Sequence, residues 1–245
     1  MTAQHALPAD LHALDRRFVL VEEAVEMPLG RVTLCKPRSA DDLISEADFV
    51  KDERLPYWAD LWSASIILAS FIETTLGGAR GAKPRVAPSG TGRRALELGC
   101  GLGLVTIAAL RAGFDVTATD YYEDATRFAA RNAVMNAGRA PAARMVDWRA
   151  LPDDLGLYDL VLAADVLYEP PHAALVAEVI RRTLAPGGTV LVADQGRVAL
   201  SAFLEESTAR GLVHKVVHRE TRPTVPASPV GSAVHAITIF ELRHG

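Results

Sequence analysis

The chain has 245 residues, 49% of them hydrophobic, and a formal net charge of −4 at pH 7. This length suits one large α/β domain with additions or two small domains, and the mild negative charge excludes a general affinity for nucleic acid or anionic lipid. The two cysteines, Cys35 and Cys100, lie far apart and form no C-x-x-C pattern, which argues against a disulfide framework or a structural zinc site. Residues 1–10 do not resemble a signal peptide, and no apolar run is long enough to span a membrane, so we expect a cytoplasmic protein without membrane partners.

Residues 1–56 are predicted to form an N-terminal extension made of a β-hairpin and a short helix. Two apolar segments, 18–25 and 31–35, flank the turn sequence Pro28-Leu-Gly30, which is typical of a hairpin. The stretch 39–45 begins with residues that favour a helix N-cap and predicts a short helix.

Residues 57–245 are predicted to form the main domain. An apolar helix over 61–76 comes first, and an aperiodic linker rich in Gly and Pro follows over 77–93. Strands and helices then alternate, which implies a doubly wound, mostly parallel α/β sheet. Residues 186–188, Pro-Gly-Gly, predict a sharp turn, and the Pro-rich loop 221–231 joins the last two strands as an antiparallel hairpin. The predicted strands are 94–98, 114–119, 142–146, 157–164, 188–194, 212–219 and 233–241, and the predicted helices are 103–112, 122–137, 171–184 and 199–209.

A glycine-rich loop, residues 97–103, joins the strand at 94–98 directly to an apolar helix. Glycines at such a junction let the backbone turn tightly and lie close against a ligand. Enzymes that bind dinucleotides use G-x-G-x-x-G and receive a pyrophosphate at the helix N-terminus. The pattern here is acidic-x-G-x-G-x-G, which suits a ligand with a nucleoside but no phosphate, such as S-adenosylmethionine.

Asp120 ends the next predicted strand, about 20 residues after the glycines, where a carboxylate can accept both hydroxyls of a ribose. The alternative is that Asp120 caps the helix predicted to begin near Tyr122.

With these motifs in this order, the chain resembles class I S-adenosylmethionine-dependent methyltransferases. More narrowly, it resembles methyltransferase family 16, which contains protein lysine methyltransferases. The specific feature is Asp165-Val-Leu-Tyr168 after the fourth strand, combined with an upstream Leu-Trp segment, because the glycine loop is common to methyltransferases of every substrate class. The resemblance covers residues 55–195 well and the two ends of the chain only loosely. The matching segments are 56–65, 96–103, 119–120, 146–149 and 158–168.

The resemblance implies a seven-stranded Rossmann-like sheet with an antiparallel last strand, and a site for S-adenosylmethionine. The backbone of Gly99, Cys100 and Gly101 would wrap the methionine part of this cofactor, and Gly103 would allow close helix packing. Glu97 would orient the loop near the amino group of the cofactor.

The same resemblance assigns the nucleoside side of the cofactor. Asp120 would hold the ribose hydroxyls, Asp147 and Trp148 would lie beside the adenine, and Ala164 would line the floor. Trp62 would close over the methionine side. The alternatives are that Trp148 is a rim aromatic and that Trp62 is the buried anchor of its helix.

Asp165 and Tyr168 are the predicted catalytic residues. They follow the apolar run 160–164 at the carboxyl end of a buried strand, where open α/β sheets place their ligands. A lysine amine has an ordinary pKa near 10.4, so methyl transfer needs desolvation or a hydrogen-bond acceptor to favour the free amine. Asp165 could accept that hydrogen bond, and Tyr168 could wall the channel and attract the cation. The alternative is that Asp165 caps the next segment and Tyr168 packs against Pro170-Pro171.

We therefore expect an N-methyltransferase that acts on a protein lysine and releases S-adenosylhomocysteine. The alternative is a methyltransferase of a small amine or an N-heterocycle of the nicotinamide type. An RNA substrate is disfavoured by the acidic balance. An NAD-dependent oxidoreductase would need a phosphate-cradling G-x-x-G that residues 103–106 lack, and a non-catalytic binding domain would not need Asp165 and Tyr168. No metal site is predicted.

Overall fold

The structure is a computed structural model that describes residues 14–39, 43, 56–77, 90–223 and 234–245. Most of the short helix expected over 39–45, most of the linker over 77–93 and most of the loop 221–231 lie outside the described residues.

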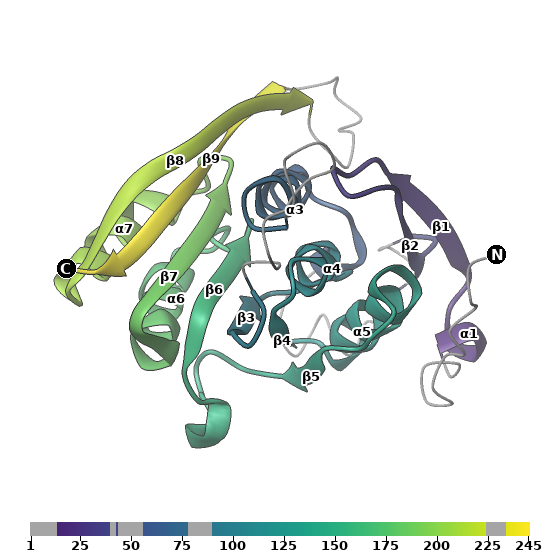
Figure 1. Ribbon diagram of the computed structural model, residues 1–245, viewed down its shortest axis with the longest axis horizontal. Coiled ribbons are helices and arrows are strands. Elements are labelled where there is room, and N and C mark those ends of the chain that lie inside the picture. The colour runs from purple at the N-terminus through teal and green to yellow at the C-terminus, as the bar shows by residue number, and fades with distance from the viewer. Residues whose placement is uncertain (1–13, 40–42, 44–55, 78–89, 224–233) are drawn as a thin grey trace.

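A seven-stranded sheet with the order β5-β4-β3-β6-β7-β9-β8 forms the centre of the molecule (Figure 1). The first five strands in this order pair in parallel, and β9 pairs antiparallel with both of its neighbours. This arrangement confirms the predicted doubly wound, mostly parallel sheet with an antiparallel last strand. The strands are β3 (Arg94–Leu98), β4 (Asp115–Asp120), β5 (Ala142–Met145), β6 (Tyr158–Ala164), β7 (Leu184–Asp194), β8 (Leu212–Pro223) and β9 (Val234–His244).

Helices cover both faces of the sheet, as the apolar sequences of its central strands require. Figure 1 shows α3, α4 and α5 on one face and α6 and α7 on the other. Two large hydrophobic clusters fill the two interfaces. None of the described helices is long and apolar enough to cross a membrane. The helices are α3 (Ser63–Thr75), α4 (Leu104–Arg111), α5 (Glu123–Ala137), α6 (His172–Thr183) and α7 (Leu200–Ala209), with short 3₁₀ turns at Tyr57–Ala59 and Asp153–Leu155.

The start of β7 differs from the prediction. The strand begins at Leu184 and runs through the Pro-Gly-Gly sequence at 186–188, where a sharp turn was expected. Tyr158 pairs with Leu184 but Leu160 pairs with Thr189, so extra residues of β7 bulge out between these two pairs. The predicted turn is therefore wrong as a strand boundary, because pairing with β6 continues on both sides of the glycines.

The N-terminal segment forms the predicted hairpin. A short helix α1 (Leu14–Arg17) precedes β1 (Leu20–Val25) and β2 (Val32–Pro37), which pair antiparallel in a sheet of their own. Figure 1 shows this hairpin beside α5.

Two asparagines on α5 form hydrogen bonds to the backbone of β2, in the way that the backbone of a neighbouring strand would. The amide oxygen of Asn136 accepts the backbone N–H of Thr33 at 2.9 Å, and its amide nitrogen donates to the Thr33 carbonyl at 2.9 Å. Asn132 makes the same pair of bonds with Cys35, at 2.8 and 3.0 Å. Asn132 also donates to the carbonyl of Leu102 in the glycine loop, at 2.9 Å, so one side chain joins the hairpin to that loop.

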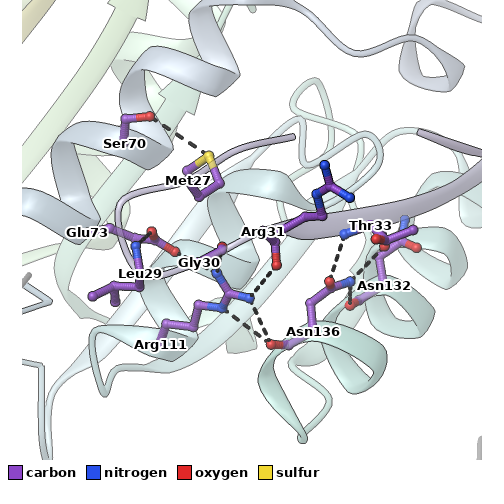
Figure 2. A network of polar contacts seen from close by, with 10 residues as sticks. All are labelled: Met27, Leu29, Gly30, Arg31, Thr33, Ser70, Glu73, Arg111, Asn132 and Asn136. Carbon is purple, nitrogen blue, oxygen red and sulfur yellow. Dashed lines mark hydrogen bonds and ion pairs between the residues drawn. The ribbon is translucent and has the colours of Figure 1, made fainter. Parts of the chain in front are cut away.

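A buried ion pair fastens the turn of the hairpin to the core (Figure 2). Glu73 on α3 is fully buried, pairs with Arg111 on α4 at 3.1 Å, and accepts the backbone N–H of Leu29 at 2.8 Å. Arg111 also donates to the carbonyls of Gly30 at 3.0 Å and Asn136 at 3.2 Å. The pair therefore satisfies backbone groups from two separate segments, the hairpin turn and the end of α5.

Replacing Arg111 with alanine should destabilise the fold by about 3–5 kcal/mol, because it leaves the buried Glu73 carboxylate without its cation. Arg127→Ala is the matched control: it removes an exposed ion pair with Glu123 on α5 and should cost no more than about 0.5 kcal/mol. Urea unfolding of the three proteins measures both values. Equal stabilities for the two variants would contradict the role given to the buried pair.

Candidate active site

A cavity of about 510 Å³ lies at the carboxyl ends of the central strands. It is located where the strand order reverses, with β3 and β4 on one side and β6 on the other, which is where open α/β sheets bind ligands. The structure brings every site residue predicted from the sequence into the wall of this one cavity. These residues are Trp62, Glu97, Gly99, Cys100, Gly101, Gly103, Asp120, Asp147, Trp148, Ala164, Asp165 and Tyr168.

The glycine loop joins β3 to α4 with three left-handed glycines. Gly99, Gly101 and Gly103 have φ angles of 67°, 49° and 83°. A Cβ on Gly103 would lie 2.7 Å from the Cα of Ala129, so only glycine lets the start of α4 approach α5 this closely. All three glycines line the cavity, and at these positions only backbone can face it.

Glu97 is a buried carboxyl in the penultimate position of β3. Thr106 on α4 donates a hydrogen bond from its hydroxyl to Glu97 Oε2. Burial raises the pKa of Glu97 to about 8, and the nearby Asp120 carboxylate contributes in the same direction.

Asp120, the last residue of β4, has both a structural contact and access to the cavity. Its Oδ2 accepts the backbone N–H of Gly101 at 3.0 Å, and its Oδ1 accepts the N–H of Tyr122 at 3.1 Å. Tyr122 is the N-cap residue of α5, so Asp120, which precedes the helix, accepts a hydrogen bond at its start. Burial raises the pKa of Asp120 to about 6.

Asp147 and Trp148 follow β5 at another edge of the cavity. The Asp147 carboxylate forms a bidentate pair with Arg149, with bonds of 2.9 Å from Nε and 2.8 Å from Nη2. The Trp148 ring lies edge-on to the ring of His172, with centroids 5.3 Å apart. His172 itself is buried and its Nδ1 lies 2.8 Å from the carbonyl oxygen of Val166.

Asp165 follows β6 in a left-handed backbone conformation, with a φ angle of 59°. Its side chain is 1% exposed, and both carboxylate oxygens are engaged. Arg197 donates to Oδ1 from Nε at 2.7 Å and to Oδ2 from Nη2 at 2.8 Å. Gln195 donates to the same two oxygens at 3.1 and 2.8 Å.

Three aromatic rings line the same cavity as this carboxylate. Tyr168 is 37% exposed, and its ring lies 5.4 Å from that of Tyr57. The rings of Tyr57 and Trp62 are 6.0 Å apart, and Trp62 Nε1 donates to the Tyr57 carbonyl at 2.8 Å. Trp62 is half-buried at the N-terminus of α3 and faces the cavity, while Trp58 is the tryptophan buried in the core.

Sequence reasoning did not select Tyr57, Arg149, His172 or Arg197, although all four line the cavity. Arg197 follows the carboxyl end of β7, so the rule that led to Asp165 applies to it equally. Tyr57 lies within the matching segment 56–65, next to the predicted Trp62. The contact between Arg197 and Asp165 joins residues far apart in the chain, and only the fold reveals it.

The fold is that of class I methyltransferases. Magnesium protoporphyrin IX methyltransferase from Synechocystis PCC 6803, solved with bound SAM, superposes with a TM-score of 0.53 at 16% identity, over 82% of this chain and 86% of that chain. Precorrin-6y C5,15-methyltransferase from Geobacter metallireducens superposes with a TM-score of 0.53 at 13% identity, over 74% of this chain and 89% of that chain.

Residues 49–209 match the family model described as lysine methyltransferase, and the chain belongs to this family. It is 32% identical to EEF1A lysine methyltransferase 3 of Mus musculus over 68% of this chain and 67% of that protein. It is 28% identical to the electron transfer flavoprotein beta subunit lysine methyltransferase of Danio rerio over 77% of this chain and 67% of that protein. A ubiquinone biosynthesis O-methyltransferase of Methylococcus capsulatus is 34% identical over 46% of this chain and 47% of its own length. The chain is therefore a methyltransferase.

Proposed function

We propose that this protein transfers a methyl group from S-adenosylmethionine to the side-chain amine of a lysine in a protein. The observation that carries the proposal is the convergence on one cavity of two different sets of groups. The glycine loop, Glu97 and Asp120 suit a nucleoside with an amino acid attached. Asp165 and the aromatic rings around it suit a cationic amine.

The residues at the loop fit the cofactor in shape and in chemistry. The left-handed glycines leave backbone open to the cavity, and the Asp120 carboxylate keeps acceptor capacity beyond the backbone N–H groups that it already accepts. We assign the ribose hydroxyls to Asp120, the amino group to Glu97 and the adenine to Trp148 and Asp147. The backbone of Gly99, Cys100 and Gly101 would hold the methionine part of the cofactor. Gly103 would allow close helix packing, and Ala164 would line the floor of the site.

The acceptor side would align the amine with the methyl group. When bound, S-adenosylmethionine supplies a methyl group on a sulfonium: the amine lone pair forms the N–C bond, and the electron pair of the broken S–C bond stays on sulfur. The acceptor ammonium first loses one proton to solvent, because only the free amine has that lone pair. Asp165 would orient the nitrogen by accepting a hydrogen bond, and Tyr168 and Trp62 would line the channel.

A protein is the favoured acceptor. The names of two relatives, the mouse and zebrafish proteins, state lysine methylation of a protein. The net charge of −4 does not favour nucleic acid as the partner. A small amine acceptor is the alternative, and the labelling experiment below separates the two.

Incubating a cell lysate with the enzyme and radioactive S-adenosylmethionine should label a protein band. Asp165→Asn should reduce this labelling by about 100-fold or more while S-adenosylhomocysteine still binds, because a neutral amide replaces the charged acceptor that orients the amine. Asp154→Asn, at an exposed aspartate outside the cavity, is the matched control and should label normally. Unchanged labelling by Asp165→Asn would remove its catalytic assignment, and label found only in small molecules would favour the alternative acceptor.

The affinity for S-adenosylhomocysteine should fall as the pH drops through about 6. Asp120 has a pKa raised to about 6, and the ionised carboxylate is the better acceptor for ribose hydroxyls, so binding is full above this pH and is lost below it. Below the pKa the affinity should fall about tenfold per pH unit. The carboxyl and amino groups of the ligand titrate near 3.5 and 8 and do not interfere between pH 5 and 7.

Isothermal titration at several pH values measures this dependence. In the Asp120→Asn variant, the affinity should be weak and independent of pH over the same interval. A wild-type affinity that stays constant from pH 7 to pH 5 would exclude Asp120 as the ribose acceptor.

A further inference from the structure

The carboxylate of Asp165 has no vacant place for an incoming amine. A carboxylate has about four lone-pair directions, and each oxygen of Asp165 already accepts one bond from Arg197 and one from Gln195. An acceptor amine that bonds to Asp165 must therefore take the place of one of these donors.

Arg197 is the donor that can leave. Its side chain is 29% exposed and lines the cavity, whereas Gln195 is not one of the residues that line it. The guanidinium carbon lies 5.2 Å from the centre of the Trp62 ring, so the cation is held by an aromatic face as well as by the carboxylate. The tyrosine rings of Tyr57 and Tyr168 complete the same corner of the cavity. This is the environment that a lysine ammonium would need.

The backbone of Arg197 is anchored independently of its side chain. Asp194, the last residue of β7, accepts the N–H groups of Gly196 and Arg197 on Oδ1, each at 2.7 Å. The loop then enters α7 at Leu200. The guanidinium can therefore move out of the cavity toward solvent without displacing β7 or α7.

We propose that Arg197 is a resident cation that occupies the place of the acceptor ammonium, and that acceptor binding displaces its guanidinium from Asp165 while Gln195 continues to hold the carboxylate. This inference rests on the proposed function, because it concerns the acceptor of that reaction. It makes Arg197 a specificity-determining residue.

The displacement selects the chemical class of the acceptor. Once the guanidinium leaves, the buried charge of Asp165 needs another cation, and an alkylammonium group supplies one. A neutral acceptor, such as a phenol or an alcohol, would leave the carboxylate buried without a cation. The site therefore favours an aliphatic amine that arrives in its charged form and then loses one proton to solvent before the methyl transfer.

Binding of n-butylammonium, which reproduces the end of a lysine side chain, tests the proposal. The protein is saturated with S-adenosylhomocysteine and titrated with n-butylammonium by NMR. Arg197→Gln should bind n-butylammonium about tenfold or more tightly than the wild type, because the competing cation is gone. The double variant Asp165→Asn/Arg197→Gln should lose this gain.

Arg182→Gln is the matched control for net charge. Arg182 pairs with an exposed carboxylate of Asp153 and lies outside the cavity, so this variant should bind n-butylammonium like the wild type. An Arg197→Gln variant that binds S-adenosylhomocysteine normally but binds n-butylammonium no more tightly than the wild type would overturn the proposal.

A measurement on the wild type covers the case in which Arg197→Gln does not fold. The Nε–H signal of Arg197 should shift in proportion to the n-butylammonium bound, and an unchanged signal at saturation would overturn the proposal. Failure of this proposal can be distinguished from failure of the proposed function. A wild-type protein that binds S-adenosylhomocysteine but labels no protein contradicts the proposed function. The titrations with n-butylammonium test the role of Arg197 alone.

Discussion

The parallel pairing of β3 with β4 on one side and β6 on the other is the constraint on which the site depends. It brings the carboxyl ends of strands from distant parts of the chain to a single edge, where the strand order reverses. Glu97 and Asp120 come from β3 and β4, and Asp165 follows β6. The helices on both faces exclude water from the rest of the sheet, so this edge is where the central strands can meet a ligand.

The same convergence buries acidic groups close together, and the fold stabilises each one differently. Asp120 is held by backbone N–H groups, Glu97 by a hydroxyl of Thr106, and Asp165 by the cation of Arg197. Burial raises the pKa values of Asp120 and Glu97. Among the described residues, no ion pair is seen for the two buried carboxyls assigned to the cofactor, Asp120 and Glu97, while the buried carboxylate assigned to the acceptor is already paired with Arg197. This difference is the physical basis for the two halves of the proposed site.

The sequence was sufficient for the strand and helix pattern and for the glycine loop and the strand-end carboxyls of the cavity wall. These features depend on local periodicity and on glycines next to an apolar helix. The sequence could not reveal features that depend on long-range pairing. The bulge at the start of β7 arises because pairing with β6 continues past the glycines at 187 and 188. The amide pairing of Asn132 with β2, and the pairing of Arg197 with Asp165, join residues that no local pattern connects.

We propose that the cavity binds S-adenosylmethionine rather than a dinucleotide. Isothermal titration of the wild-type protein with S-adenosylhomocysteine and, separately, with NAD tests this claim most directly. We predict binding of S-adenosylhomocysteine and none of NAD, because the loop lacks the G-x-x-G sequence that receives a pyrophosphate. Tight binding of NAD without binding of S-adenosylhomocysteine would contradict the account.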